Sequence, residues 1–240
     1  SASEVSSVLV ATADPDKVAG QNLVRGGVGL VDAAQAVAQQ VTATGDSYRT
    51  ADGKQRETAL NFGFQESAKS FGGKKTVVVT NYGTQPVTYN VAAEASAQSA
   101  TATVSVSPAQ ITVKPGRTER VTVTLDAPAG AVGSSTAGGF SFYEFSGDVV
   151  LTSPSDTLRV PYLLVPRSTT DVMAVGDLKV TKKNKAVDGE VSLSLKNRAG
   201  AFETSADFYT WGLEDKKDAP KSFTDTGYDL RAAGVQSFPD

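Results

Sequence analysis

Acidic side chains are the groups in this sequence best suited to do chemistry, and they gather in two short clusters. These are Asp14 and Asp16 around Pro15, and Glu214, Asp215 and Asp218 after Trp211. Two carboxylates held face to face could hydrolyse a glycosidic bond, and carboxylate oxygens could bind Ca²⁺. Acidic residues that are close in sequence on a loop need not form either arrangement in space. We therefore expect solvated loops or helix caps, and we predict no catalytic residue and no metal site.

Histidine and cysteine are both absent from the 240 residues. A Ser-His-Asp hydrolase needs an imidazole to take the serine proton, so this chain cannot complete such a triad. Without cysteine there is no disulfide framework and no thiolate metal site. Without histidine the commonest ligand of zinc and copper is missing. We expect the chain to be inactive as an enzyme by itself and to use no cofactor, with Ca²⁺ left open but unsupported.

The composition is that of a folded protein with no strong charge. Hydrophobic residues make up 40% of the chain, charged residues 20%, and the formal net charge is −3. No basic surface dominates, so nucleic acid is a poor partner. No apolar run approaches the roughly 18 residues needed to cross a bilayer. A β-rich chain with many Ser, Thr, Ala and Val residues suits the cell exterior, so we expect a secreted or cell-surface protein, bacterial in origin.

The first forty residues predict two helices. Residues 4–13 place Val5, Val8 and Leu9 on one helical face. Asp32 is placed to cap a second helix over 33–41. An exposed apolar face tends to associate, so we expect Val5, Val8 and Leu9 to be covered by a partner surface, by the rest of the chain or by another copy.

Gly26, Gly27 and Gly29 lie between these helices. A phosphate-binding loop would need a Lys-Ser/Thr pair after its glycines, or a Gly-x-Gly-x-x-Gly pattern between a strand and a helix. Neither is present, so we interpret these glycines as a structural turn.

Three motifs in this region resemble the end of the catalytic domain of subtilisin-like serine proteases. They are Val10-Ala11-Thr12-Ala13-Asp14, Gly27-Val28-Gly29-Leu30-Val31-Asp32 and Ala33-Ala34-Gln35-Ala36-Val37. The resemblance implies that residues 1–45 are the last two helices of such an α/β domain, downstream of its catalytic serine. The nucleophile motif is absent, so no catalytic residue can be carried over. The implied partner is the upstream protease domain of the same polypeptide.

After Thr50 the apolar periodicity changes to the two-residue alternation of β-strands. Candidate strands lie at 75–80, 87–91, 102–106, 111–113, 121–125, 149–151 and 158–164, with a turn at Pro115-Gly116. Short alternating strands separated by turns predict an antiparallel β-sandwich over residues 55–166. Leu60-Asn61-Phe62-Gly63, the stretch from Lys75 to Asn81 and Leu158-Arg159-Val160-Pro161-Tyr162 also resemble the fibronectin type III-like domain that follows the protease domain in several large subtilases.

Residues 167–175 look like a linker, and residues 175–240 predict a second β domain. Strands are expected at 178–180, 191–195 and 206–211, with Asp188-Gly189 as a hairpin turn. So few strands are thin for an independent sandwich. We therefore expect this domain to be incomplete and to leave an unpaired, adhesive edge.

Aromatic residues supply the candidate binding surfaces. They are Phe142, Tyr143 and Phe145 near the end of the predicted sandwich, and Tyr209 and Trp211 in the last third. Tyr and Trp form platforms for sugars and peptides. In alternating strands, however, one face must be core, so core packing is the simpler interpretation. For the first group a contact between domains is a further alternative.

These observations lead to two hypotheses of different classes. The first is a non-catalytic C-terminal scaffold region of a secreted subtilisin-like serine endopeptidase, which packs against and stabilises the protease domain and meets its peptide substrate only indirectly. The second is a cell-surface adhesive or carbohydrate-binding β module. In either case the fold class is mainly β, a fibronectin III-like sandwich preceded by two helices and followed by a second, incomplete β domain, and self-association of the chain is open.

Overall fold

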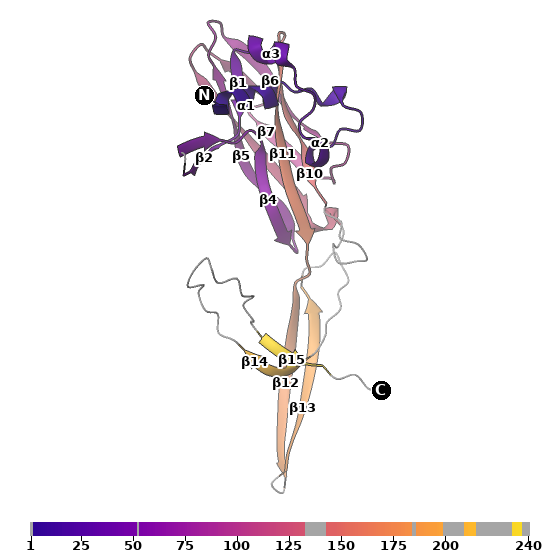
Figure 1. Cartoon of the computed structure of the whole chain (residues 1–240). Coiled ribbons are helices and arrows are strands. Elements are labelled where there is room, and N and C mark those ends of the chain that lie inside the picture. Colours follow the sequence, from indigo (N-terminus) through magenta and orange to yellow (C-terminus); the bar gives the residue numbers. More distant parts are fainter. Residues whose placement is uncertain are drawn as a thin grey trace. The chain divides into compact units, whose positions relative to one another are not determined.

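A computed structural model describes residues 2–51, 53–132, 143–183, 186–198, 209–214 and 232–236. The chain divides into two units, residues 1–202 and 203–240. The described residues are mainly β-strand and the sheets are largely antiparallel (Figure 1), which confirms the predicted fold class.

Two sheets form the sandwich of the first unit. Among the described residues, one sheet has the order β1-β5-β9-β7 and the other β4-β11-β10-β6-β8. The first contains β1 (Val41–Thr44), β5 (Ser70–Asn81), β9 (Thr118–Pro128) and β7 (Thr103–Ser107). The second contains β4 (Leu60–Ser67), β11 (Thr157–Ser168), β10 (Phe145–Thr152), β6 (Val87–Ala95) and β8 (Gln110–Val113). β4 pairs parallel to β11, and the other pairs in these sheets are antiparallel.

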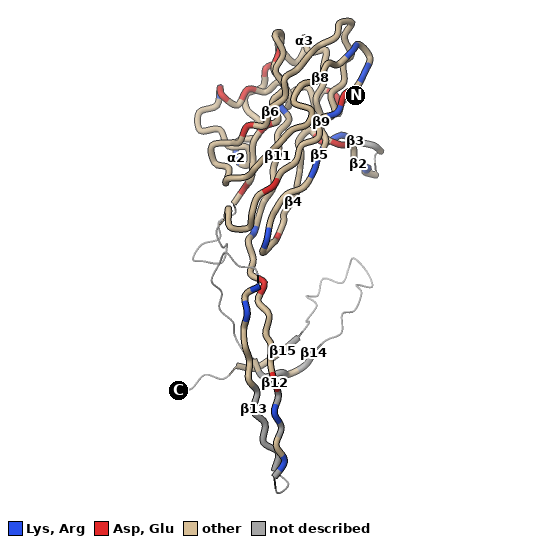
Figure 2. Tube along the Cα trace, turned by 180° about the vertical axis from the view of Figure 1, so that it is seen from behind, with Lys and Arg blue, Asp and Glu red and all other residues tan. Residues whose placement is uncertain are grey.

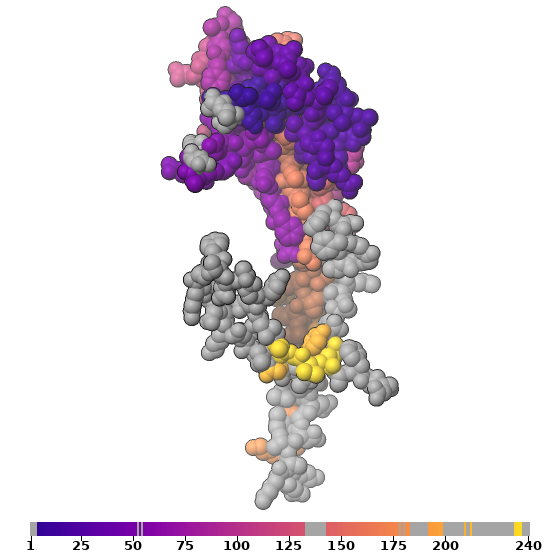
Figure 3. All heavy atoms as spheres, in the orientation of Figure 1, coloured from indigo at the N-terminus to yellow at the C-terminus, as the bar shows by residue number. Residues whose placement is uncertain are grey.

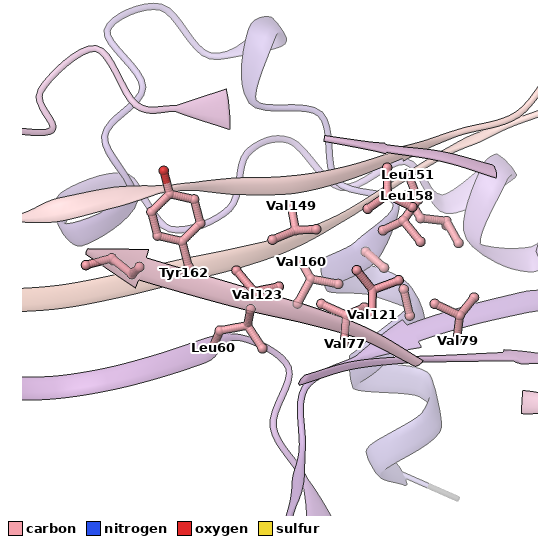
Figure 4. Packing of buried hydrophobic residues seen from close by; sticks show 14 of the residues in the cluster. Leu60, Val77, Val79, Val121, Val123, Val149, Leu151, Leu158, Val160 and Tyr162 are labelled. Atoms are coloured by element: carbon pink, nitrogen blue, oxygen red, sulfur yellow. The ribbon is translucent and has the colours of Figure 1, made fainter. Parts of the chain in front are cut away.

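The core lies between these two sheets and consists of the inward side of the predicted alternation (Figure 4). Val77 pairs with Val121 in the first sheet, and Val149 pairs with Val160 in the second. All four side chains are fully buried. Burying a Val or Leu side chain contributes roughly 1.5–3 kcal/mol. The sandwich therefore has a substantial apolar core without any disulfide.

The predicted turn at Pro115-Gly116 is confirmed. The backbone N–H of Arg117 donates to the carbonyl of Lys114 at 3.0 Å. Gly116 has φ 65°, which a residue with a Cβ rarely adopts. Proline followed by a positive-φ glycine is the pattern of a type II turn. This turn reverses the chain from β8 into β9.

The N-terminal segment is helical, as predicted, with one helix more than expected. It contains α1 (Ala2–Ala11), a 3₁₀ turn η1 (Pro15–Lys17), α2 (Leu23–Gly26) and α3 (Ala33–Ala38). The Asp32 side chain accepts a hydrogen bond from the Gln35 N–H at 2.9 Å, which confirms the predicted cap. The unexpected helix, α2, is capped in the same way by the Asn22 side chain.

The second predicted helix is shorter than expected, because Val41 begins β1 and pairs with Asn81 of β5. Ala11, Val41 and Ala43 belong to the same buried cluster as the sandwich strands. The segment that resembles the end of a protease domain is thus joined to the sandwich through shared core residues. Beyond β1, a short hairpin pairs β2 (Ser47–Thr50) with β3 (Gly53–Arg56).

A long ribbon follows the sandwich strands in sequence. It pairs β12 (Val172–Lys183) with β13 (Ala186–Asn197), and Lys183 lies opposite Ala186. The prediction of a turn at Asp188-Gly189 is therefore wrong, because both residues lie inside β13. A reversal there would leave only residues 190–197 for the second strand, whereas the observed reversal lets all of 186–197 pair. The predicted linker is also shorter, since β11 continues to Ser168.

In the second unit, β14 (Thr210–Glu214) pairs antiparallel with β15 (Ala232–Val235). The register shifts between Trp211 and Leu213. Asp215 and Asp218 of the second acidic cluster lie outside the described residues. Among the described helices, none has the length and apolarity that a bilayer crossing requires.

Candidate functional site

An apolar groove lies between α1 and α3, and we call it the α1–α3 groove. It has a volume of about 340 Å³. Its lining residues are Glu4, Val5, Val8, Leu9, Ala33, Ala36 and Val37. Val5 is 60% exposed and Val37 is 89% exposed. Val8 and Leu9 are half-buried, so the chain covers the predicted helix face only in part, and whether a partner covers the rest stays a prediction.

Helix α1 contacts the sandwich through a different face. Ser7 and Ala11, four residues apart, are buried. Residues at this spacing lie one above the other on a helix, and small side chains let its backbone approach a sheet closely. Val5, Val8 and Leu9 are consequently turned toward the groove and not toward the sandwich core.

Helix α3 also turns its polar side to the sandwich. Gln35 Nε2 donates to the carbonyl of Thr157 at 3.0 Å. Gln39, just past the helix, donates through Nε2 to Asp156 Oδ2 at 2.8 Å. A surface helix ordinarily buries its apolar side and exposes its polar side. In α3 this is reversed, because Ala36 and Val37 line the open groove. Figure 3 shows the N-terminal segment, in indigo, at the molecular surface.

Asp156 links the N-terminal segment to the core. Its Oδ2 accepts both the Gln39 amide and the hydroxyl of Tyr89, the latter at 2.9 Å. Burial, together with the charge of Asp156, raises the pKa of Tyr89 well above its ordinary value. Tyr89 is therefore a neutral donor at any physiological pH, and it holds Asp156 where Gln39 can reach it.

The glycines between the helices have a backbone role. Leu30 and Asp14 exchange two backbone hydrogen bonds of 2.9 Å. Gly29, next to Leu30, has φ 115°, and a Cβ there would lie 2.5 Å from the Asp14 carbonyl. Gly27 ends α2 with φ 74°, and a Cβ on Gly26 would lie 3.0 Å from Gln21 Oε1. These contacts agree with a structural turn.

The first acidic cluster caps a helical turn. Asp14 Oδ1 accepts from the Asp16 N–H at 3.0 Å at the start of η1. Lys17 Nζ lies 3.5 Å from Asp14 Oδ2. Asp14 thus serves as the helix cap expected from the sequence. In the part of the chain that the structure describes, no acidic group of three or more is arranged to hold a metal ion.

A charged cavity of about 250 Å³ separates residues 15–28 from the outer face of the second sheet. Its charged lining comprises Asp16, Glu94, Asp148 and Arg159. Asp148 lies directly opposite Glu94 in the pairing of β10 with β6, and like charges at such positions repel. Arg159 Nη2 lies 4.0 Å from Asp16 Oδ2.

The cavity raises the pKa of Asp148 from 3.8 to about 6. Burial is the main cause, Arg159 opposes the rise, and Glu94 and Asp16 add to it. No pattern in the sequence singles out Asp148, because Gly147-Asp148 has the composition of an ordinary exposed turn. Residues 15–28 line the same cavity from more than a hundred positions away in the sequence, so no local pattern could have found it.

The candidate aromatic residues do not form one surface. Tyr143 is half-buried and lines a cavity of about 450 Å³ together with Asn22, Arg25, Gln98 and Glu144. Phe145 is fully buried and its ring centroid lies 6.2 Å from that of Phe71. The interpretation of Phe145 as a binding aromatic is therefore wrong, because its ring belongs to the sandwich core.

The remaining candidates are only partly described. Tyr209 is 60% exposed. The backbone of Trp211 lies in β14, but its side chain lies outside the described residues, as does the whole of Phe142. The structure therefore supports core packing for Phe145 and leaves Tyr143 and Tyr209 as accessible aromatics.

Residues 62–163 match the family of the Fn3-like domain. This range coincides with most of the sandwich, so the chain contains an Fn3-like β domain. No curated protein matches the chain.

Several solved structures share a limited likeness. A FixG-related protein from Vibrio parahaemolyticus is 15% identical, with a TM-score of 0.34 over 53% of this chain and 97% of its own. An Escherichia coli alpha-2-macroglobulin, activated by porcine elastase, is 14% identical, with a TM-score of 0.33 over 58% of this chain and 10% of its own. The Vibrio cholerae VesB protease is 14% identical, with a TM-score of 0.31 over 56% of this chain and 33% of its own. We draw no functional conclusion from likeness of this degree.

Proposed function

We propose that the chain is the non-catalytic C-terminal scaffold region of a secreted subtilisin-like serine endopeptidase. In this role the Fn3-like sandwich carries the N-terminal segment, and that segment packs against the protease domain of the same polypeptide. Peptide hydrolysis belongs to the protease domain, and this region stabilises it and meets the substrate only indirectly.

The reversed polarity of α3 carries the proposal. Gln35 and Gln39 fix its polar side to the sandwich, while Ala36 and Val37 line an open apolar groove with α1. An exposed apolar surface of this kind marks an interaction site. The groove is built from the two helices that resemble the end of a subtilase catalytic domain. A protease core is therefore the partner that accounts for both the motif and the exposure.

The energetic gain from such packing is appreciable. Val5 and Val37 are the most exposed large apolar side chains lining the groove. Burying each fully would contribute roughly 1.5–3 kcal/mol. A protease domain that covered both would be more stable joined to this scaffold than separated from it.

The test uses the natural polypeptide with its own flanking sequence. A Gly-Thr-Ser-Met-Ala segment encoded upstream of Ser1 supports the proposal, and an upstream array of β repeats contradicts it. Within that polypeptide, Val37→Asp should lower the melting temperature of the protease domain and speed its autolysis. Val24→Asp is the matched control, because Val24 is exposed on α2 but does not line the groove. Equal effects of the two variants would contradict a groove-specific contact.

A second candidate, a carbohydrate-binding β module, is favoured by the cavity beside Tyr143. An aromatic ring beside amide and charged side chains suits a sugar, whose faces are apolar and whose edges are hydroxyls. Asn22, Arg25, Gln98 and Glu144 supply those polar groups. Binding to a panel of bacterial cell-wall glycans that is lost in Tyr143→Ala and kept in Val37→Asp would favour this function over the first.

A further inference from the structure

Residues 15–28 form a loop whose two ends lie side by side, and we call this loop the flap. Just outside it, Asp14 and Leu30 exchange two backbone hydrogen bonds. Among the described residues, the flap forms hydrogen bonds only with itself and with Asp14. A loop with close ends and internal bonding of this kind can move against a sheet without losing its own structure.

The polar attachment of the flap to the sandwich is weak. Within the described part of the chain it consists of one ion pair, between Asp16 Oδ2 and Arg159 Nη2 at 4.0 Å, and the Asp16 side chain is 89% exposed. An exposed pair at this distance contributes little to stability. Gln21 lines the cavity under the flap, and its buried Oε1 has no hydrogen-bond partner among the described residues. The closed position of the flap is therefore only lightly held.

The cavity under the flap holds more acid than base. Asp16 of the flap lines it together with Glu94 of β6, Asp148 of β10 and Arg159 of β11. Three carboxyl groups thus share one guanidinium, and Figure 2 shows acidic positions, in red, on the segments near α2 and β6. A carboxylate that loses its water among like charges is disfavoured, whereas a neutral carboxyl group is not. The charge state of Asp148 therefore affects how stable the closed flap is.

Tyr162 of β11 also faces Asp148. Its hydroxyl donates to the carbonyl of Glu94 at 3.4 Å. Burial, with the charge of Asp148 as a smaller cause, raises the pKa of Tyr162 to about 12. Tyr162 consequently stays neutral in mild acid and at neutral pH, so it does not compete with Asp148 as the group that responds to pH.

We propose that the flap closes over Asp148 when this carboxyl group is protonated and opens when it is ionised. The sandwich then carries a device that responds to mild acid, and this device is separate from the proposed functions. The Asp14–Leu30 pair lies between the flap and the helices that line the α1–α3 groove. The flap can therefore open while the groove keeps its form.

The direction of the response follows from proton binding. In the structure, with the flap over the cavity, the pKa of Asp148 is raised from 3.8 to about 6, mainly by burial. Under an open flap, water reaches the carboxylate and the pKa falls toward its ordinary value. The closed form thus binds the proton more tightly, and acid favours closure. With these two pKa values, the ratio of closed to open flap rises about tenfold from pH 7.5 to pH 5.

Distances between spin labels on the full chain test this motion, since the natural sequence contains no cysteine that could be labelled by accident. One label replaces Val24, which is exposed on α2 within the flap, and the other replaces Thr122, which is exposed on β9. Double electron–electron resonance should give one narrow distance distribution at pH 5. At pH 7.5 a second population should appear, with the closed-to-open ratio about tenfold lower. The matched control pairs Thr122 with Val37, which is exposed outside the flap, and should not change with pH.

Removal of the titrating group tests the cause. Asp148→Asn keeps the size of the side chain but cannot ionise, so the flap should stay closed at both pH values. Asp126→Asn is the control, because Asp126 is exposed on β9 in the other sheet and should leave the pH response unchanged. Circular dichroism of each variant checks that the sandwich is folded. The comparison of the two label pairs needs no change at Asp148, so it tests the proposal even if Asp148→Asn misfolds.

Three outcomes overturn the proposal. One is a Val24–Thr122 distance distribution that is the same at pH 5 and pH 7.5. Another is an equal change in the Val37–Thr122 pair, which would mean that the whole N-terminal segment moves and not the flap. The last is a pH response that persists in folded Asp148→Asn, which would assign the effect to another group.

Discussion

The sandwich and the β12–β13 ribbon are built from similar sequence but differ in what they bury. Thr-Val-Val-Val-Thr in β5 and Val-Ser-Leu-Ser-Leu in β13 are both rich in the branched and polar residues of strands. Val77 of β5 is fully buried, whereas Leu193 of β13 is half exposed. The sandwich has a second sheet over its apolar side. An alternating sequence pattern therefore specifies a strand. Whether the apolar side chains of that strand are buried depends on whether a second sheet packs against them.

The largest expected effect comes from a substitution in the buried core of the sandwich. Val123→Asp places a carboxylate in the sandwich core, where Val123 is fully buried. An unpaired buried charge costs several kcal/mol, on the order of the whole stability of a domain. We expect loss of the cooperative thermal transition in circular dichroism. Val175→Asp in the ribbon is the control and should melt like the natural chain, and similar behaviour of the two variants would refute the sandwich core.

A smaller effect concerns Asp148, whose pKa is raised by burial from 3.8 to about 6. A carboxyl with a raised folded-state pKa destabilises the fold above that pKa, and the penalty disappears below the unfolded value. The natural chain should thus gain stability as the pH falls from about 7 toward 4. Asp148→Asn should raise the free energy of unfolding by about 2 kcal/mol at pH 8 and by little at pH 4.

Urea titrations at several pH values measure this difference. Asp177→Asn in the exposed ribbon keeps Asp148 and is the control, so its stability should depend on pH as that of the natural chain does. A gain in Asp148→Asn that is the same at pH 4 and pH 8 would contradict a buried, titrating carboxyl and point to a packing effect.

The loss of a helix cap should come next in size. The Asp32 side chain accepts the Gln35 N–H at the start of α3, and removing such a cap costs about 1 kcal/mol. Asp32→Ala should therefore lower the midpoint of urea unfolding modestly while the sandwich stays folded. Hydrogen exchange should place the added opening in residues 33–38, and protection unchanged there would count against the cap.

The smallest expected effect comes from a substitution in the exposed β12–β13 ribbon. Val175→Ser removes an apolar side chain that is already half exposed in β12. Surface substitutions of this kind change stability by about 0.5 kcal/mol or less. Chemical unfolding of the monomer should not distinguish this variant from the natural chain. A loss as large as that of a core residue would mean that the ribbon has a covering layer.

Particular residues mark the limit of prediction from sequence. The alternation through Val121, Val123 and Leu125 and the cap at Asp32 were predictable, because each depends on neighbours in the chain. The turn at Asp188-Gly189 was predicted wrongly. The local preference of these two residues for a turn is weaker than the gain from pairing all of residues 186–197 with β12. Asp148 gave no signal, because the residues that bury it lie more than a hundred positions away in sequence.

By itself, the sequence determined most strands of the sandwich, two of the helices before them and the lack of the histidine that a Ser-His-Asp triad needs. These follow from periodicity, capping and residue type, which act over a few positions. Only the tertiary structure decided that α3 turns Gln35 toward the sandwich and Val37 outward, that Asp148 is half-buried, and that among the described residues β13 pairs only with β12. Each of these depends on which distant segments come to lie side by side, and burial and electrostatic effects act through that proximity.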